Sequence, residues 1–293
     1  MTGLAVDVID PTSSRELARN LGFTESPVWS AQECLYVTSV NRGVVYRIDW
    51  GNGTYVQAVE TGGGPSGMAM SSDDLLVCQD GGQAMRSRSP LRPPAGIQRI
   101  RRRRVAHLVA APLSSPSDCV VGPDGRLWIT DPTGRDLDHR ATPGNVWALD
   151  LATHSLEPMV DGVLFPNGIE FSTDARSLFV AESATGRVLR FSLGADGTWE
   201  RDPWRVPRLD GVPDGLAVDA DDHVWVACSF SGTVVRLRPD GDIRARLDFG
   251  THATPTALCF AGSDLEDLVV TSARGGAVLT VPGSAHGTRG RRS

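Results

Sequence analysis

The chain has 293 residues, of which 40% are hydrophobic and 22% charged, and its formal net charge is −6. This is the composition of a soluble globular protein, and the acidic balance argues against nucleic acid or an anionic membrane as the main partner. No apolar run approaches the ~20 residues that a membrane-spanning helix needs, so membrane-spanning proteins are excluded as well.

One supersecondary pattern recurs along the chain. Six segments begin at a proline and continue through a short apolar strand, a turn and a second apolar strand, and successive prolines are 38, 51, 50, 47 and 42 residues apart. A Gly-containing turn then leads to a third strand. In chain order the segments open at Pro27 (PVWSAQECLYVTSV), Pro65 (PSGMAMSSDDLLVCQD), Pro116 (PSDCVVGPDGRLWITD), Pro166 (PNGIEFSTDARSLFVAES), Pro213 (PDGLAVDADDHVWVAC) and Pro255 (PTALCFAGSDLEDLVVTS).

These repeats predict an all-β fold. Turns such as GPDGR and TDARS supply Asp, Gly and Ser for tight reversals, and no stretch shows sustained helical periodicity. Repeats of roughly 40–50 residues with about four strands each are typical of a β-propeller, whose blades surround a central channel. We therefore predict a single domain, residues 1–293, folded as a six-bladed β-propeller with four-stranded blades. Because the ring must close, we expect residues 4–19 to add an outer strand to the last blade.

A basic insertion interrupts the second repeat. It covers residues 85–104 (MRSRSPLRPPAGIQRIRRRR), has two isoleucines, Ile97 and Ile100, interleaved with its last basic residues, and has no aromatic residue. Nucleic-acid-binding arms are basic in the same way, but the missing aromatic residues favour a solvated outer hairpin that follows a Pro-rich loop. Its functional use stays open.

The residue after each proline varies although the repeat keeps its frame. In a propeller the innermost strand of each blade starts near one end of the channel, so equivalent positions converge on the axis. We expect this residue to face the shared cavity, and we expect Asp118 to point away because adjacent strand residues face opposite sides. Glu25, just ahead of the first blade in FTESPVW, is a further candidate. The varying residues are Val28, Ser66, Ser117, Asn167, Asp214 and Thr256.

A carboxylate, an amide oxygen and a second carboxylate that meet in one cavity form an all-oxygen site. Calcium and magnesium prefer such ligands, and manganese or zinc can also be held by them. The alternative interpretation is that Asn167 and Asp214, each followed by glycine, only shape turns. The residues alone leave both interpretations open.

Three motifs in order, TESPVW, PNG–strand–DARSLFVAES and PDG–strand–DDHVWVA, resemble the senescence-marker-protein/gluconolactonase family, which includes regucalcin and drug-responsive lactonases. The resemblance covers nearly the whole chain. It implies one divalent metal ion on the channel axis, held by Glu25, Asn167 and Asp214, with Asp214 also placed as the catalytic acid/base. Calcium is the favoured ion, and zinc, manganese and magnesium are alternatives.

The third blade departs from the family pattern. Relatives often carry SPND, in which the Asn reaches the metal or the substrate, whereas this chain has SPSD with Ser117 in that place. We expect Ser117 to contact substrate, or the metal through a water. The Arg and Glu that bind sugar lactones in some relatives have no evident counterparts, which leaves sugar specificity open.

A second acidic cluster lies in TDPTGRDLDHR, residues 130–140, with Asp131, Asp136, Asp138 and His139. The resemblance implies that a structural calcium can bind in this neighbourhood, although the spacing does not match an EF-hand. The other interpretation is a solvated loop at the channel mouth, from which His139 contacts substrate.

We predict a gluconolactonase-like enzyme, a metal-dependent hydrolase of a lactone, in which the cation polarises the carbonyl and Asp214 is the general base. Two alternatives stay open: the same metal site acting on another electrophile, such as a phosphoester or a specialised-metabolism substrate, and a non-catalytic calcium-binding protein. The expected partner is a small organic molecule, because Trp29, Phe171 and Phe230 lie near the channel. We expect a monomer or a weak homodimer.

The cysteines and the N-terminal sequence favour a cytoplasmic location. MTGLAVDVIDPTSSRELARNLG lacks the basic and apolar regions of a secretion signal. The five cysteines are scattered singly, and four lie inside apolar, strand-like runs, as small buried hydrophobic residues do. They are Cys34, Cys78, Cys119, Cys228 and Cys259.

Overall fold

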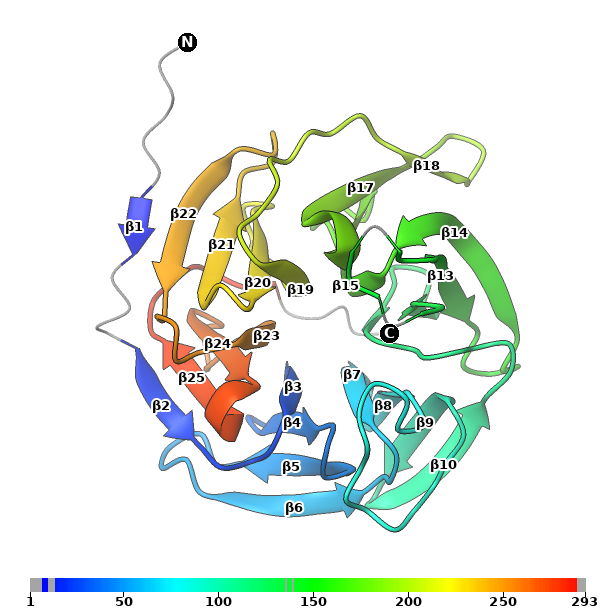
Figure 1. Cartoon of the computed structure of the whole chain (residues 1–293), viewed down its shortest axis with the longest axis vertical. Helices are drawn as coiled ribbons and strands as arrows, with labels where there is room; N and C mark the ends of the chain where they lie inside the picture. Colours follow the sequence, from blue (N-terminus) through cyan, green and yellow to red (C-terminus); the bar gives the residue numbers. More distant parts are fainter. Residues whose placement is uncertain (1–6, 10–13, 135, 139, 289–293) are drawn as a thin grey trace.

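The computed structural model describes residues 7–9, 14–134, 136–138 and 140–288. Six antiparallel sheets stand around a central axis, and each sheet is followed in the ring by the next one in the sequence (Figure 1). This arrangement confirms the predicted six-bladed β-propeller. No helix in the described parts of the chain is long and apolar enough to cross a membrane.

Each blade contains four strands in simple order from the axis outward, and the inner strands are β3, β7, β11, β15, β19 and β23. The blades comprise, in order, β3 (Thr24–Trp29), β4 (Leu35–Ser39), β5 (Val44–Ile48) and β6 (Tyr55–Glu60); β7 (Pro65–Ser71), β8 (Asp74–Gln79), β9 (Gly96–Arg101) and β10 (Arg104–Val109); β11 (Cys119–Val121), β12 (Leu127–Asp131), β13 (Pro143–Leu149) and β14 (Leu156–Leu164); β15 (Pro166–Phe171), β16 (Ser177–Glu182), β17 (Arg187–Leu193) and β18 (Trp199–Arg201); β19 (Val212–Val218), β20 (Val224–Ser229), β21 (Thr233–Leu237) and β22 (Ile243–Asp248); β23 (Pro255–Ala261), β24 (Asp267–Ser272), β25 (Ala277–Val281) and β2 (Arg15–Ala18).

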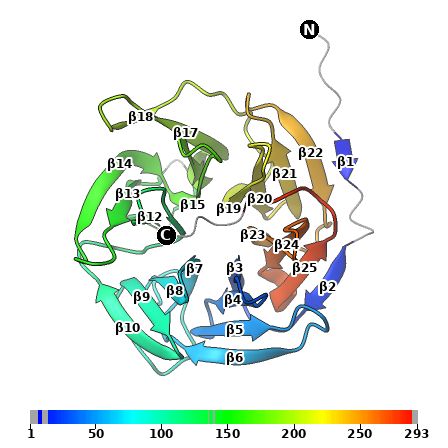
Figure 2. The same ribbon diagram turned by 180° about the vertical axis from the view of Figure 1, so that it is seen from behind.

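The N-terminal part of the chain adds two strands at the rim. β2 pairs antiparallel with β25, so the last blade takes its outer strand from the beginning of the chain. β1 (Asp7–Ile9) pairs parallel with β22 and gives the fifth blade a fifth strand, which both views place at the outer rim (Figure 1, Figure 2). The sequence pattern did not predict this second pairing. It covers backbone groups of β22 that would otherwise form an open sheet edge.

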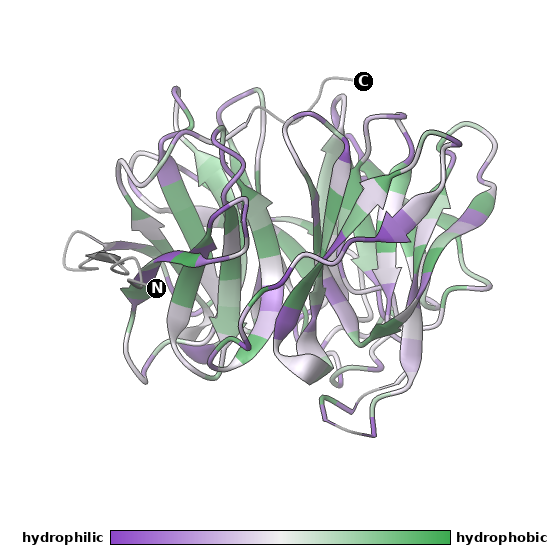
Figure 3. Cartoon of the chain, turned by 90° about the horizontal axis from the view of Figure 1, so that it is seen from above, coloured by the Kyte–Doolittle hydropathy of each residue, from purple (hydrophilic) through white to green (hydrophobic). Residues whose placement is uncertain are grey.

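The hydrophobic core is divided among the interfaces between blades. Six clusters of buried apolar side chains each join two neighbouring sheets; in one, Phe179 of β16 packs with Leu216 of β19 and Val226 of β20. Both faces of a blade are therefore covered, which is why all six residues of β20 (VWVACS) are buried. Hydrophobic residues follow the strands, and hydrophilic ones gather mostly in the connections (Figure 3).

The basic insertion is mainly part of the second blade. Residues 96–101 and 104–109 form β9 and β10, an ordinary hairpin. Arg102 and Arg103 form its turn, with φ of 48° and 65°. β10 is largely exposed whereas β9 is mostly buried, so the predicted solvated outer hairpin is confirmed for its outer strand and not for its inner one. The loop itself, residues 80–95, also reaches the channel, because Ala84 and Met85 line the cavity described next.

Candidate active site

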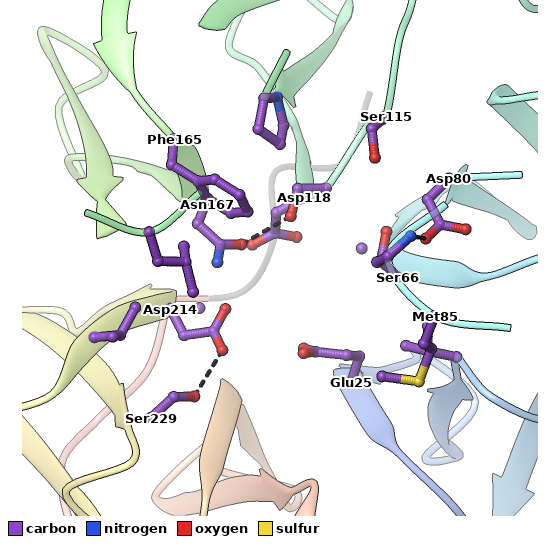
Figure 4. Close-up of a pocket in the computed structure, with 18 of the residues that line it drawn as sticks. Glu25, Ser66, Asp80, Met85, Ser115, Asp118, Phe165, Asn167, Asp214 and Ser229 are labelled. Carbon is purple, nitrogen blue, oxygen red and sulfur yellow. Dashed lines mark hydrogen bonds between the residues drawn. The ribbon is translucent and has the colours of Figure 1, made fainter. Parts of the chain in front are cut away.

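A cavity of about 310 Å³ lies on the channel axis, at the end where the inner strands begin. Side chains from several blades converge on it, among them Glu25 from the first blade, Asn167 from the fourth and Asp214 from the fifth (Figure 4). Ser117 of the third blade also lines it. The cavity thus brings together the four described residues that were predicted for the axial metal and the substrate. His139 lies outside the described residues.

The inner strands begin with an irregular stretch that decides which residues face the cavity. In the first blade the register shifts between Glu25 and Val28, so Glu25 occupies the place that a proline holds in other blades. The corresponding shifts in the second, fourth, fifth and sixth blades fall at Pro65/Met68, Pro166/Ile169, Pro213/Leu216 and Pro255/Leu258. Such bulges change the direction of side chains at a strand end.

Two of the six predicted cavity residues are wrong, and the bulge explains the first of them. Val28 pairs with Tyr36 and packs in the core between the first two blades, because the position equivalent to Ser66 is Ser26. Thr256 is 1% exposed and donates its hydroxyl proton to the backbone oxygen of Thr24. The other four, Ser66, Ser117, Asn167 and Asp214, do line the cavity.

Asp118 lines the cavity too, contrary to the expectation that it points away. It precedes β11 and lies in the irregular stretch, where strand alternation does not apply. The second, fourth and fifth blades have glycine at this position, and a Cβ at Gly67 would lie 2.4 Å from the Cα of Asp118. The sequence signal was therefore present: PSD stands where three other blades read PSG, PNG and PDG.

Hydrogen bonds hold the polar side chains at the base of the cavity, which include Ser117, Asn167, Asp214 and Ser229 and are called its floor below. Ser229 Oγ donates to Oδ2 of Asp214 at 2.8 Å, and Ser117 Oγ donates to Oδ1 of Asn167 at 2.9 Å. Asn167 Nδ2 in turn donates to Ser183 Oγ at 3.3 Å. Ser117 therefore orients the amide oxygen of Asn167. The family pattern, in which Asn stands at the position of Ser117, did not suggest this role.

Four residues with carboxyl groups line this cavity, Glu25, Asp80, Asp118 and Asp214, and three of them have raised pKa values. Burial raises the pKa of Glu25 well above its usual range, and the nearby charges of Asp214 and Asp118 raise it further. Burial raises the pKa of Asp214 to about 7 although Ser229 and Asn167 hydrogen bond to it, and burial also raises that of Asp118 to about 7. No Lys, Arg or His stands among the described lining residues to balance these charges. A divalent cation, which prefers oxygen ligands, fits this donor set.

The raised pKa values predict an unusual pH dependence for the metal-free protein. Between the unfolded value near 4 and the folded value of about 7, the folded state binds more protons than the unfolded state. The free energy of unfolding should therefore fall as pH rises from 5 to 8, and the melting temperature in EDTA should fall with it. Asp118→Asn should flatten this slope, and a slope equal to that of the wild type would contradict the assignment.

The second acidic cluster does not come together around one point. The carboxylate of Asp131 is buried and accepts the backbone N–H groups of Ser114 and Ser115. Asp136 and Asp138 are instead paired with Arg140, at 3.5 and 3.0 Å. In the described part of this segment the geometry therefore favours a loop at the channel mouth, and Gly134 and Leu137 line the cavity from it.

Asp219, Asp221 and His223 form a compact acidic group at the turn between β19 and β20. Oδ2 of Asp219 accepts hydrogen bonds from Trp225 Nε1 at 2.9 Å and from Arg236, and Oδ1 faces His223 Nδ1 at 3.2 Å. Asp219 is 1% exposed. Its oxygens are thus already used by protein groups, which indicates a structural role in the fifth blade.

Asp219→Ala should lower the free energy of unfolding by about 3 kcal/mol, because it leaves the indole N–H and the guanidinium of Arg236 without their buried partner. Denaturant unfolding in EDTA measures this loss. The matched control is Asp221→Ala, an exposed neighbour in the same group, which should change stability by less than about 0.5 kcal/mol. Equal effects of the two substitutions would contradict this structural role of Asp219.

A larger cavity, about 880 Å³, lies on the other side of the irregular stretches and is lined by later residues of the inner strands. Trp29 and Phe171, two of the aromatic residues predicted to lie near the channel, line this second cavity. Phe230, the third predicted aromatic residue, does line the site.

The chain is thus a six-bladed propeller with an acidic, oxygen-rich cavity on its axis. The chain belongs to the SMP-30/Gluconolactonase/LRE-like family, whose model matches residues 23–274. This match confirms the resemblance seen in the sequence motifs.

Two curated relatives align with most of the chain. Pentonolactonase XacC of Haloferax volcanii is 29% identical over 90% of this chain and 86% of its own, and the 6-deoxy-6-sulfogluconolactonase of Pseudomonas putida is 28% identical over 85% and 83%. Among solved structures, a calcium-binding protein, regucalcin, from Agrobacterium tumefaciens aligns over 99% of both chains with a TM-score of 0.78 at 20% identity. At that identity the likeness shows the fold alone.

Proposed function

We propose that the protein is a metal-dependent hydrolase that opens a lactone ring. The main support for this proposal is that Glu25, Asn167 and Asp214 converge on the floor of one axial cavity. The chain also belongs to the SMP-30/Gluconolactonase/LRE-like family. Relatives named as lactonases support the reaction class. The substrate is a small molecule, because the cavity of about 310 Å³ is at the lower end of the range for ligand sites.

The oxygens of Glu25, Asn167 and Asp214 would hold the divalent cation, with calcium favoured and zinc, manganese and magnesium as alternatives. When bound, the cation would supply positive charge that polarises the lactone carbonyl and stabilises the tetrahedral oxyanion. Ser117 acts on this site indirectly, because its hydroxyl fixes the orientation of the Asn167 amide.

Asp214 serves as the general base. One of its oxygens is held by Ser229, and the other points into the cavity (Figure 4). Asp214 takes a proton from a water molecule while the water oxygen bonds to the carbonyl carbon. The ring C–O bond then breaks, the leaving oxygen takes up a proton, and the product is an open-chain hydroxy acid.

Hydrolysis of a panel of lactones, followed by proton release, tests this function. The protein is treated with EDTA and then supplied with calcium, zinc, manganese or magnesium. Turnover that is lost with EDTA and restored by one metal supports the proposal. Intact lactones in the presence of bound metal would reject it and would favour the two alternatives, chemistry on another electrophile such as a phosphoester, or calcium binding without catalysis. Gel filtration tests the predicted monomer or weak homodimer.

A further inference from the structure

Apolar side chains form the walls of the cavity above its acidic floor. They come from four of the blades and from the loop between β8 and β9 of the second blade, and they include Phe23, Val40, Met85, Leu137, Phe165 and Phe230. The charged lining residues in the described part of the chain are all acids. These walls offer an anionic or highly polar substrate few groups that could balance its charge or form hydrogen bonds with it.

Three of the five lining hydroxyl groups already use their protons within the protein. Ser66 Oγ donates to the backbone oxygen of Pro116 at 3.1 Å, Ser117 Oγ donates to Asn167, and Ser229 Oγ lies within donating distance of both Asp214 and Pro255. A serine has a single hydroxyl proton to give. A polyhydroxylated sugar ring would therefore find few free donors at these three serines, and each buried hydroxyl without a partner weakens binding.

Two phenylalanines at the cavity adopt the left-handed backbone region, Phe165 with φ of 55° and Phe230 with φ of 69°. A bulky residue in this region is an outlier, and such strain gathers at ligand-binding sites. The side chain of Phe230 is also 76% exposed, so packing in the core does not account for it. Both residues line the cavity and are sequence neighbours of floor residues, Phe165 before Pro166–Asn167 and Phe230 after Ser229.

The opposite wall comes from the loop that follows β8. Asp80 accepts the backbone N–H groups of Gly82 and Ala84, which fixes the start of this loop, and Met85 lies across the cavity from Phe165 (Figure 4). Methionine is flexible and packs well against irregular apolar groups. Two aromatic rings and a methionine thus surround the space above the carboxylates.

We propose that the substrate is an uncharged lactone that carries an apolar substituent, alkyl or aryl, and that Phe165, Phe230 and Met85 bind this substituent. The inference rests on the proposed lactone hydrolysis and specifies its substrate class. It distinguishes this chain from the relatives whose names refer to sugar lactones.

The test compares kcat/KM for γ-decalactone, γ-butyrolactone and D-glucono-δ-lactone in the metal-restored wild type. We expect γ-decalactone to exceed the sugar lactone by at least ~10-fold, since each buried methylene favours binding. Phe230→Ala should shrink the preference for γ-decalactone over γ-butyrolactone by about 10-fold. The control is Val56→Ala, an exposed residue of the outer strand β6, which should leave this preference unchanged.

Phe230→Gly separates substrate binding from a structural role. Glycine tolerates the left-handed backbone, so the melting temperature should rise or stay constant while the preference for γ-decalactone falls. A wild type that prefers the sugar lactone, or Phe230 variants with an unchanged preference, would overturn the inference and leave lactone hydrolysis intact. If no lactone is hydrolysed, the proposed function fails. NMR binding of γ-decalactone to the metal-free protein, weakened in Phe230→Ala, then supports the apolar subsite, and absence of binding overturns it.

Discussion

Replacing Asp214 by asparagine should lower kcat for lactone hydrolysis by at least ~10³-fold, because the amide cannot accept the proton of the attacking water. The substitution is nearly isosteric, and the side chain can still accept the hydrogen bond from Ser229. Initial rates of proton release at saturating metal measure the effect, and calorimetry shows how much metal binding remains. A variant that binds metal and keeps full activity would rule out Asp214 as the base.

Ser229→Ala provides the graded comparison. It removes the 2.8 Å hydrogen bond to Asp214 without removing the carboxylate, so kcat should fall by about 10-fold, far less than in Asp214→Asn. If the two variants lose activity equally, the effect of Asp214→Asn would come from a general disturbance of the floor.

Glu25→Gln should weaken metal affinity by at least ~100-fold and abolish turnover at micromolar metal, because it removes one of the charged oxygens from the donor set. The same change should stabilise the metal-free protein at pH 8. Glu25 is enclosed with the charges of Asp214 and Asp118, and a neutral amide removes both the repulsion and the cost of burying the charge. Calorimetric titration of calcium and thermal unfolding in EDTA measure the two effects.

Glu25→Gln is informative because the expected changes in metal affinity and in the stability of the metal-free protein have opposite signs. A simple packing defect would lower both affinity and stability, whereas loss of a metal ligand should lower the first and raise the second. Glu33→Gln is the matched control, because Glu33 is exposed in the turn after β3 and should change neither quantity. Unchanged calcium affinity in Glu25→Gln would contradict the role of this residue in the metal site.

The sequence by itself determined the architecture. Each proline-led repeat carries apolar residues on both faces of its second strand, as in VWVACS of β20, and such a strand must be covered from both sides. Sheets that need a neighbour on each face, repeated six times, close into a propeller. The chain order of the blades, the approach of the N-terminal segment to the last blade and the convergence of Glu25, Asn167 and Asp214 all follow from that closure.

Only the tertiary structure decided which side chains face the axis. The inner strands begin with bulges. The rule that successive strand residues face opposite sides therefore fails at the positions that lie at the cavity. Val28 turns into the core, Glu25 takes the place of a proline, and Asp118 enters the cavity where other blades have glycine. The left-handed conformations of Phe165 and Phe230 are likewise seen only in the tertiary structure. Local sequence sets which strands form, whereas these directions depend on how six blades crowd around one axis.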